Sequence, residues 1–225
     1  MEVEDVSHVG QWVQLLETQK AALQVASRRK GERPRDRKAL DQLVREFMIS
    51  RMQIQHMSIQ RNHTLHHSFI PPPYLPSVAS LIDLQQIYIK DLRLQIHHRG
   101  CYLLLRAATP SNVMTAVMAI MEDAVGGGIM LQLYQQKGDA YRPADEIIQS
   151  GNVCIVKEPY FKVMNDGGYG LRVDHVSDIL WLALNDDRVP LAWQPRVSEL
   201  KDAEKLKEDG NAALKAGKLH KAVEM

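Results

Sequence analysis

Three consecutive prolines, Pro71 to Pro73, constrain the fold of this chain more than any other feature of its sequence. Proline fixes φ and has no backbone N–H, so the run excludes a helix and favours an extended segment. Apolar residues before the run recur at helical spacing, and apolar residues after it alternate as they do in strands. The prolines therefore mark a boundary, and we assign residues 68–91 to a proline-rich strap or linker.

Two amphipathic helices are predicted before the prolines, over residues 6–23 and 36–60. Val13 and Leu16 belong to the apolar stripe of the first, and Leu43 and Phe47 to that of the second. Neither stripe continues for the three or four clean heptads that a free-standing coiled coil needs. The pattern predicts a helical hairpin over residues 1–67.

A basic loop joins the two predicted helices. Gly31 and Pro34 interrupt the helical pattern there. A nuclear import signal, a phosphate-contacting patch and an ordinary solvated loop all fit such a run. The seven cations of the loop are Arg28, Arg29, Lys30, Arg33, Arg35, Arg37 and Lys38.

Residues 92–184 carry a β pattern. One long bent strand begins near Leu92, and a second and third strand form a hairpin closed by the glycine run at 126–128. A short helix follows near Pro143. A fourth strand is predicted from Asn152 to Met164, with Pro159 marking an edge or bulge, and a fifth strand follows the turn at 165–168. This order of elements is that of the OB-fold, a five-stranded Greek-key barrel. The fold class is therefore predicted as α+β: an N-terminal helical hairpin, a small antiparallel OB-like β-barrel and a partial helical hairpin at the end.

Barrels of this kind bind single-stranded nucleic acid or peptide on an exposed strand face, with aromatic rings for stacking and cations for phosphate. Acidic residues are as frequent in this segment as basic ones, which favours a protein ligand over nucleic acid. The candidate ligand face consists of Tyr102, Arg106, Tyr134, Lys157, Tyr160 and Lys162.

A linker over residues 185–198 leads to helix formers over residues 199–225. Gly210, Ala213 and Ala222 resemble the small positions that open a tetratricopeptide (TPR) repeat, and a full repeat of 34 residues would extend past Met225. We therefore interpret this part as an incomplete first repeat. Lys207 and Asn211, one turn apart, resemble half of the clamp with which chaperone-binding TPR domains hold a C-terminal carboxylate.

The segments FIPPPYLPS, DLRLQIHHRGCYLLLR and DGGYGLRVDHVSDILWL, followed by the start of a repeat, resemble the N-terminal region of fungal TPR proteins that carry a SET domain. The resemblance implies a region of a protein lysine methyltransferase that uses S-adenosylmethionine. The sequence contains no Asn-His-Ser-Cys run of the SET signature, so we expect this chain not to be an enzyme and to hold no cofactor. The implied partner is a protein, such as a chaperone C-terminus bound by a completed TPR domain.

Other site chemistries are poorly supported by the sequence. Asp174, His175 and Ser177 are neighbours, whereas a catalytic triad is assembled from separate elements, so we expect no catalytic residues. The histidines lack ligand spacing, and the glycines of Asp166–Gly170 precede a strand rather than a helix, so neither a metal site nor a phosphate loop is predicted. The two cysteines are too few for a secreted disulfide framework.

The formal net charge of +1 provides no global attraction to nucleic acid or to membranes. No run of about 18 apolar residues is present, and we expect a cytoplasmic or nuclear protein without membrane contact. The sequence thus favours a non-catalytic protein-interaction region of a TPR and SET type protein. The alternative is single-stranded nucleic-acid binding by the OB-like barrel together with the basic loop.

Overall fold

A computed structural model describes residues 7–60, 73–113, 116–134, 147–164, 166–194, 211 and 215. The chain divides into two compact units, residues 1–182 and residues 183–225. In the described part of the first unit there are two long helices, α1 (Ser7–Arg28) and α2 (Leu40–Gln60). Short 3-10 turns lie at Leu81–Asp83, Ile89–Asp91 and Val176–Asp178 in the first unit and at Leu191–Trp193 in the second.

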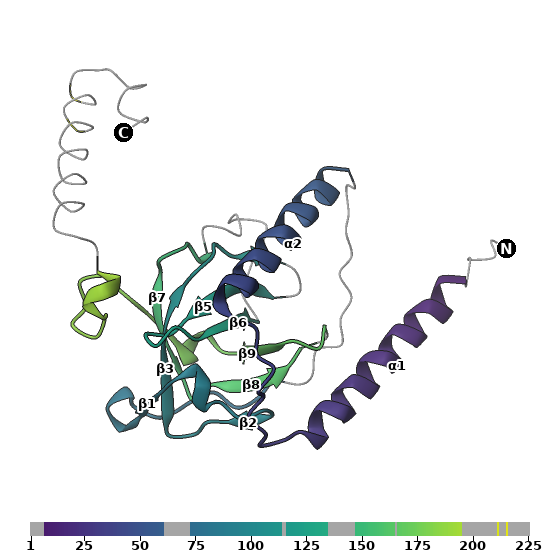
Figure 1. Ribbon diagram of the computed structural model, residues 1–225, viewed down its shortest axis with the longest axis horizontal. Coiled ribbons are helices and arrows are strands. Elements are labelled where there is room, and N and C mark those ends of the chain that lie inside the picture. The colour runs from purple at the N-terminus through teal and green to yellow at the C-terminus, as the bar shows by residue number, and fades with distance from the viewer. Residues whose placement is uncertain are drawn as a thin grey trace. The chain divides into compact units, whose positions relative to one another are not determined.

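Ten strands of the first unit form one sheet, in the order β10-β7-β3-β5-β6-β9-β8-β2, with β1 on β3 and β4 on β5. Figure 1 shows α2 beside β5 and β6 of this sheet. Most neighbours are antiparallel, but β1 pairs with β3 and β6 with β9 in parallel. The strands are β1 (Gln85–Ile87), β2 (Ile96–His97), β3 (Cys101–Ala107), β4 (Asn112–Val113), β5 (Val117–Glu122), β6 (Gly128–Leu133), β7 (Val153–Lys157), β8 (Tyr160–Val163), β9 (Tyr169–Val173) and β10 (Ile179–Leu182).

This architecture shows that the predicted fold class is wrong. The sheet is large and mixed, rather than a small antiparallel OB-like barrel, because two of its pairs are parallel and ten strands take part. The two helices do not define a hairpin either. The described contacts of α2 are with β5 and β6, and those of α1 are with β8. The predicted partial helical hairpin at the end of the chain lies almost entirely outside the described residues.

Individual strands agree better with the sequence than the fold class does. The predicted hairpin around the glycine run is present as β5 and β6, paired from Val117 with Leu133 to Glu122 with Gly128. The long strand predicted from Asn152 to Met164 is divided into β7 and β8, because Glu158 takes a left-handed φ of 44° just before Pro159. The helix predicted at residues 143–150 lies largely outside the described part of the chain.

The core lies on one side of each strand, as alternation along the chain requires. In β6, Ile129, Leu131 and Leu133 are buried, whereas the residues between them are only partly buried. Phe161 and Leu171 continue this core across β8 and β9. The opposite face of β6 is covered at its start by α2, where Gly128 lies against Leu40.

At Gly128 the helix is therefore in close contact with the sheet. A Cβ at this position would lie 2.9 Å from the Leu40 Cα, a backbone atom that cannot rotate away. We expect Gly128→Ala to lower the free energy of unfolding by about 1–3 kcal/mol, the usual cost of overpacking. Urea denaturation followed by circular dichroism measures this change.

Gly10→Ala is the matched control, because a Cβ at Gly10 in α1 meets nothing within 4 Å. Alanine there is expected to be neutral or to stabilise the protein by up to about 1 kcal/mol through helix propensity. Equal free energies of unfolding for the two variants would contradict the close packing of α2 on β6.

Candidate functional site

Three of the six residues of the predicted ligand face lie together on the side of the sheet opposite the core. Tyr160 and Lys162 belong to β8, and Tyr134 directly follows β6. In the antiparallel register of β8 and β9, Tyr160 is opposite Arg172 and Lys162 is opposite Gly170. Residues paired across strands share a face, so Tyr160, Lys162 and Arg172 lie on one surface. We call Tyr134, Tyr160, Lys162 and Arg172 the β8–β9 face.

Two cations meet at the ring of Tyr134. The Lys162 Nζ lies 5.7 Å from the ring centroid and the Arg172 Cζ lies 5.3 Å from it, both within the range of cation–π attraction. Arg172 is buried and donates from Nε to the buried Asp174 carboxylate at 2.7 Å. Arg172 is thus compensated by a carboxylate.

Lys162 is different, because no carboxylate in the described part of the chain forms an ion pair with it. Its ammonium is partly buried, and this burial, together with repulsion from Arg172, lowers the pKa of Lys162 to about 8. A partly desolvated cation of this kind is stabilised when an anion binds beside it. Lys162 is therefore the residue of the β8–β9 face best placed to receive an acidic group.

A cluster of rings borders this face. The Tyr160 hydroxyl donates to Gln95 Oε1 at 2.6 Å, and its ring centroid lies 5.2 Å from that of His97. Tyr74 packs edge-on against His97 at 4.3 Å and against His175 at 5.6 Å. The buried Nε2 of His97 has no hydrogen-bond partner in the described structure. Burial, aided by repulsion from Arg99, lowers the pKa of His97 to about 4, so its ring is neutral at physiological pH.

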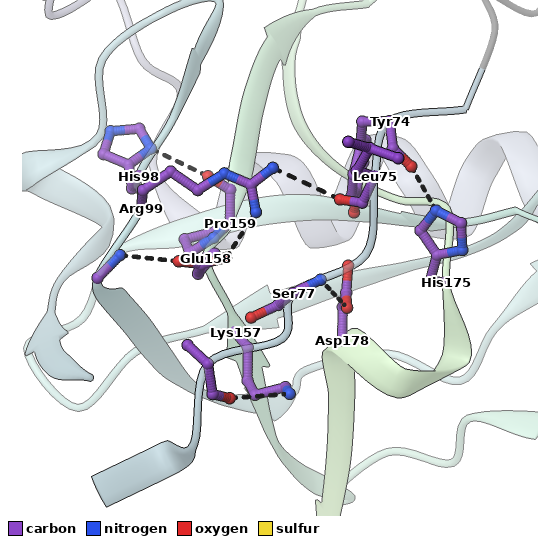
Figure 2. A network of polar contacts seen from close by, with 12 residues as sticks. Tyr74, Leu75, Ser77, His98, Arg99, Lys157, Glu158, Pro159, His175 and Asp178 are labelled. Atoms are coloured by element: carbon purple, nitrogen blue, oxygen red, sulfur yellow. Dashed lines mark hydrogen bonds and ion pairs between the residues drawn. The ribbon is translucent and has the colours of Figure 1, made fainter. Parts of the chain in front are cut away.

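Tyr74 belongs to an extended segment, residues 73–80, that polar contacts hold on the sheet (Figure 2). The backbone N–H of Tyr74 donates to Asp174 Oδ2 at 3.1 Å, and the Tyr74 carbonyl accepts from His175 Nε2. The backbone N–H of Ser77 donates to the buried Asp178 carboxylate at 2.8 Å. These contacts replace the backbone pairs that a strand would have, so an irregular segment stays ordered against the sheet.

The Arg99–Glu158 pair holds the same segment from its other side. Arg99 contacts Glu158 at 2.6 Å and donates to the Leu75 carbonyl at 3.4 Å, as Figure 2 shows. The other Glu158 oxygen accepts from the Gly100 N–H at 3.0 Å. Burial opposes ionisation of Glu158, but these donors outweigh it and lower the pKa of the carboxyl group.

The other three residues of the predicted ligand face lie elsewhere on the sheet. Tyr102 on β3 is opposite Lys157 on β7. The Tyr102 hydroxyl donates to Gln86 at 3.3 Å, and Lys157 Nζ donates to the Ala79 carbonyl at 3.4 Å. Arg106 forms an ion pair with Glu122 at 2.6 Å. These three residues therefore lie on β3 and β7, which β5 and β6 separate from β9 and β8 in the order of the sheet.

Three cations of the basic loop contact other residues of the protein, and the other four are exposed. Arg29 forms an ion pair with Glu32 at 2.8 Å and donates to the Tyr169 hydroxyl at 3.0 Å. Arg37 donates to the carbonyls of Ile89 and Leu92 and lies over the Phe161 ring, and its burial lowers its pKa. Lys38 pairs with Glu46 at 2.6 Å. The remaining four cations are exposed: Arg28, Lys30, Arg33 and Arg35.

The neighbours Asp174, His175 and Ser177 do not converge on one another. Asp174 binds Arg172 and Tyr74, His175 donates to the Tyr74 carbonyl, and the Ser177 hydroxyl donates to Asp178 at 3.3 Å. Within the described residues, no group of three or more His, Cys, Asp or Glu side chains could hold a metal ion. Asn211 is helical and exposed, whereas Lys207, its partner in the predicted clamp, lies outside the described residues.

Sequence reasoning missed Arg172, at the centre of the β8–β9 face, and its buried partner Asp174. The sequence places Asp174 only beside His175 and Ser177. The available signal was the sequence YGLRVD, in which a charged residue interrupts an otherwise apolar strand. A charge at such a position is rarely buried unless it has a partner, and an acidic residue follows two positions later on the same side.

No protein-family description matches the chain. A Gibberella zeae protein named "Methyltransferase" is 37% identical over 226 aligned residues, which span 100% of this chain and 29% of that protein. A solved structure from Leishmania major, described as an aspartyl-tRNA synthetase, is 14% identical and covers 49% of this chain and 22% of that chain. Its TM-score of 0.31 is too low to define a shared fold.

The Gibberella zeae protein agrees with the methyltransferase part of the resemblance seen in the sequence. The name of this relative contradicts our prediction that the chain is not an enzyme. The relative is similar to this chain over all of the chain's length, and it is named after a catalytic activity. That prediction rested on a missing SET signature, and the chain spans only 29% of the relative's length. In the part of the chain that the structure describes, no helix is both long enough and apolar enough to cross a membrane.

The buried ring of His97 predicts a pH-dependent stability. Its pKa is about 4 in the folded protein, against about 6.5 in an unfolded chain, so the unfolded state binds more protons between these values. The free energy of unfolding contributed by His97 is therefore fully present above pH 6.5 and falls as the pH decreases toward 4. Arg99 opposes protonation, and Glu158 and Asp178 favour it.

The measurement compares urea denaturation of the wild-type protein and of His97→Gln at pH 7.5, 5.5 and 4.5. Glutamine stays neutral, so the variant is expected to lose less stability on acidification than the wild type. A difference between the two proteins that is the same at all three values would contradict the buried neutral state of His97.

Proposed function

We propose that this chain is a region of a methyltransferase of the TPR and SET type, and that the region binds a protein partner of the enzyme. The observation that carries the proposal is the 37% identity, over the whole chain, to a protein named as a methyltransferase. The segments of the sequence that resemble fungal TPR and SET proteins support the finer assignment. The acidic and basic residues are nearly balanced, at 27 and 28, which favours a protein partner for the sheet.

The β8–β9 face is the proposed contact surface. Lys162 lies beside an aromatic ring and is partly desolvated. A carboxylate of the partner would stabilise the charged form of this lysine. Tyr134 and Tyr160 provide rigid rings with hydroxyls already oriented by Gln132 and Gln95. Tyrosine is among the side chains that interfaces favour.

The half-clamp of Lys207 and Asn211 and the cellular location of the protein are two further proposals. Lys207 and the exposed Asn211 would contribute half of a carboxylate clamp for a chaperone C-terminus, and a cytoplasmic or nuclear location would suit that partner. Their support is the resemblance to a TPR opening, together with the helical conformation of Asn211.

The methyl donor implied by the resemblance is S-adenosylmethionine. Gly167 and Gly168, the nearest match to a nucleotide-binding loop, close the β8–β9 hairpin, where the Gly167 N–H donates to the Met164 carbonyl at 3.0 Å. The Asp166 carboxylate accepts from the Gly168 N–H, so the acidic side chain lies against the turn. This turn does not fit the donor, and we assign no residue of the described chain to it.

The assignment is tested with the native protein that contains this chain, isolated through an affinity tag placed at its own gene. Incubation with S-adenosylmethionine labelled in the methyl group and with cellular protein as acceptor is expected to transfer the label to protein. Absence of transfer by material that is folded and intact would contradict the methyltransferase assignment.

Lys162→Gln tests the role of the β8–β9 face in the same assay. Removing the cation is expected to raise the KM for the protein acceptor about tenfold and to leave kcat unchanged, as loss of one charge-assisted contact of about 1.4 kcal/mol would. Lys90→Gln is the control, because it removes an exposed lysine charge that also lies over a tyrosine ring, that of Tyr88, and it should alter neither constant. A loss of kcat with an unchanged KM would contradict the binding role while leaving the assignment of the enzyme intact.

A further inference from the structure

The basic loop presents exposed cations that are not part of the β8–β9 face. We propose that Arg28, Lys30, Arg33 and Arg35 form a phosphate-contacting surface that binds the backbone of nucleic acid without regard to base sequence. All four side chains are exposed, and they lie within residues 28–35, from the last residue of α1 into the segment that leads to α2. The proposal concerns a second surface and is independent of the methyltransferase assignment.

The backbone of this segment is held in place before any ligand binds. The Gly31 N–H donates to the Leu94 carbonyl at 2.8 Å, and the Leu94 N–H donates to the Glu32 carbonyl at 2.9 Å. Pro34 is buried, and Arg37 anchors the end of the segment through the carbonyls of Ile89 and Leu92. A fixed backbone reduces the conformational entropy lost on binding, so the exposed cations are preorganised.

The acidic residues of the segment do not neutralise these four cations. Glu32 receives two hydrogen bonds from Arg29, at 2.8 and 2.9 Å. Asp36 accepts from the Tyr169 hydroxyl at 2.8 Å. Arg93 adds a further exposed guanidinium beside the loop, where it donates to the Gly31 carbonyl at 3.3 Å. The local field is therefore positive although the net charge of the chain is only +1.

The chemistry of the surface favours phosphate groups over an acidic peptide or a membrane. Three of the four cations are arginines, whose planar guanidinium binds phosphate with two parallel hydrogen bonds. The exposed side chains of residues 28–36 are charged, so the loop presents no large apolar side chain to anchor a peptide or to enter a bilayer. The Arg29 Cζ lies 5.6 Å from the centroid of the nearby Tyr169 ring, so Arg29 occupies the ring face on which a base could stack. Contacts to phosphates alone carry no sequence information.

Salt dependence provides a quantitative test. Four phosphate contacts predict that log K falls with log salt with a slope of about −3.6, which reduces the affinity roughly 150-fold between 50 and 200 mM salt. The measurement is fluorescence anisotropy of the full chain with a labelled 20-base-pair DNA duplex, repeated with duplexes of two unrelated sequences. Equal affinities for the two sequences are expected, and a strong preference for one would overturn backbone recognition.

The variant Arg33→Ala/Arg35→Ala is expected to halve the slope, to about −1.8. The matched control is Arg45→Ala/Arg188→Ala, which removes the same charge from two ion pairs outside residues 28–38, Arg45 with Asp41 and Arg188 with Asp186. The control should leave the slope within experimental error of the wild-type value. An equal effect of both double variants would show a response to net charge alone and would overturn the proposal.

Competition assays distinguish nucleic acid from an acidic peptide and from a membrane as the ligand of the loop. Unlabelled duplex is expected to displace the labelled duplex, whereas polyglutamate at equal charge concentration and vesicles containing phosphatidylserine should displace it at least tenfold less well. Displacement by polyglutamate as effective as by DNA would assign the loop to acidic peptides, and binding of the chain to the vesicles through Arg33 and Arg35 would assign it to membranes. Either result overturns the proposal, as does the absence of DNA binding at 50 mM salt.

Discussion

The buried ion pair between Arg172 and Asp174 is the interaction on which much of the structure depends. Asp174 accepts from Arg172 on one oxygen and from the backbone N–H of Tyr74 on the other, so one carboxylate joins β9 to the extended segment 73–80. Arg172 in turn lies against the Tyr134 ring, which brings the end of β6 to the same place. Removing one member of a buried pair typically costs about 3–5 kcal/mol, since the other charge is left uncompensated. The β8–β9 face is built around this pair.

Cations of this chain serve two purposes that only the folded structure separates. Arg29 and Arg37 each combine hydrogen bonds with an aromatic ring, Tyr169 for the first and Phe161 for the second. Their neighbours in sequence point to solvent. A charged side chain whose stem packs on a ring stabilises the fold, whereas an exposed one retains its charge for a ligand. Some arginines of the loop thus fix its shape, whereas others leave a positive charge available to a ligand.

Local features of this sequence were predictable, and long-range ones were not. The β5–β6 hairpin follows from a glycine turn between two apolar runs, and the break before β8 follows from Pro159, because both signals act over a few residues. The parallel pairs of β1 with β3 and of β6 with β9 leave no such mark, and the order of strands alone suggested an antiparallel barrel. The amphipathic stripes of α1 and α2 showed that each helix packs on something, but periodicity does not name the partner. The same limit applies to the site: Tyr160 and Lys162 fall within one predicted strand, whereas their meeting with Tyr134 and Arg172 depends on pairing across three strands.

The parallel pairing of β6 with β9 also bears on how the chain reaches its native state. The β5–β6 hairpin can form early because its strands are adjacent in sequence, whereas β9 arrives only after the intervening chain has been ordered. Until then the outer edge of β6 presents unpaired N–H and C=O groups, and such an edge is a template for strands of other molecules. Refolding therefore competes with intermolecular strand exchange, and the balance shifts toward aggregates as the protein concentration increases.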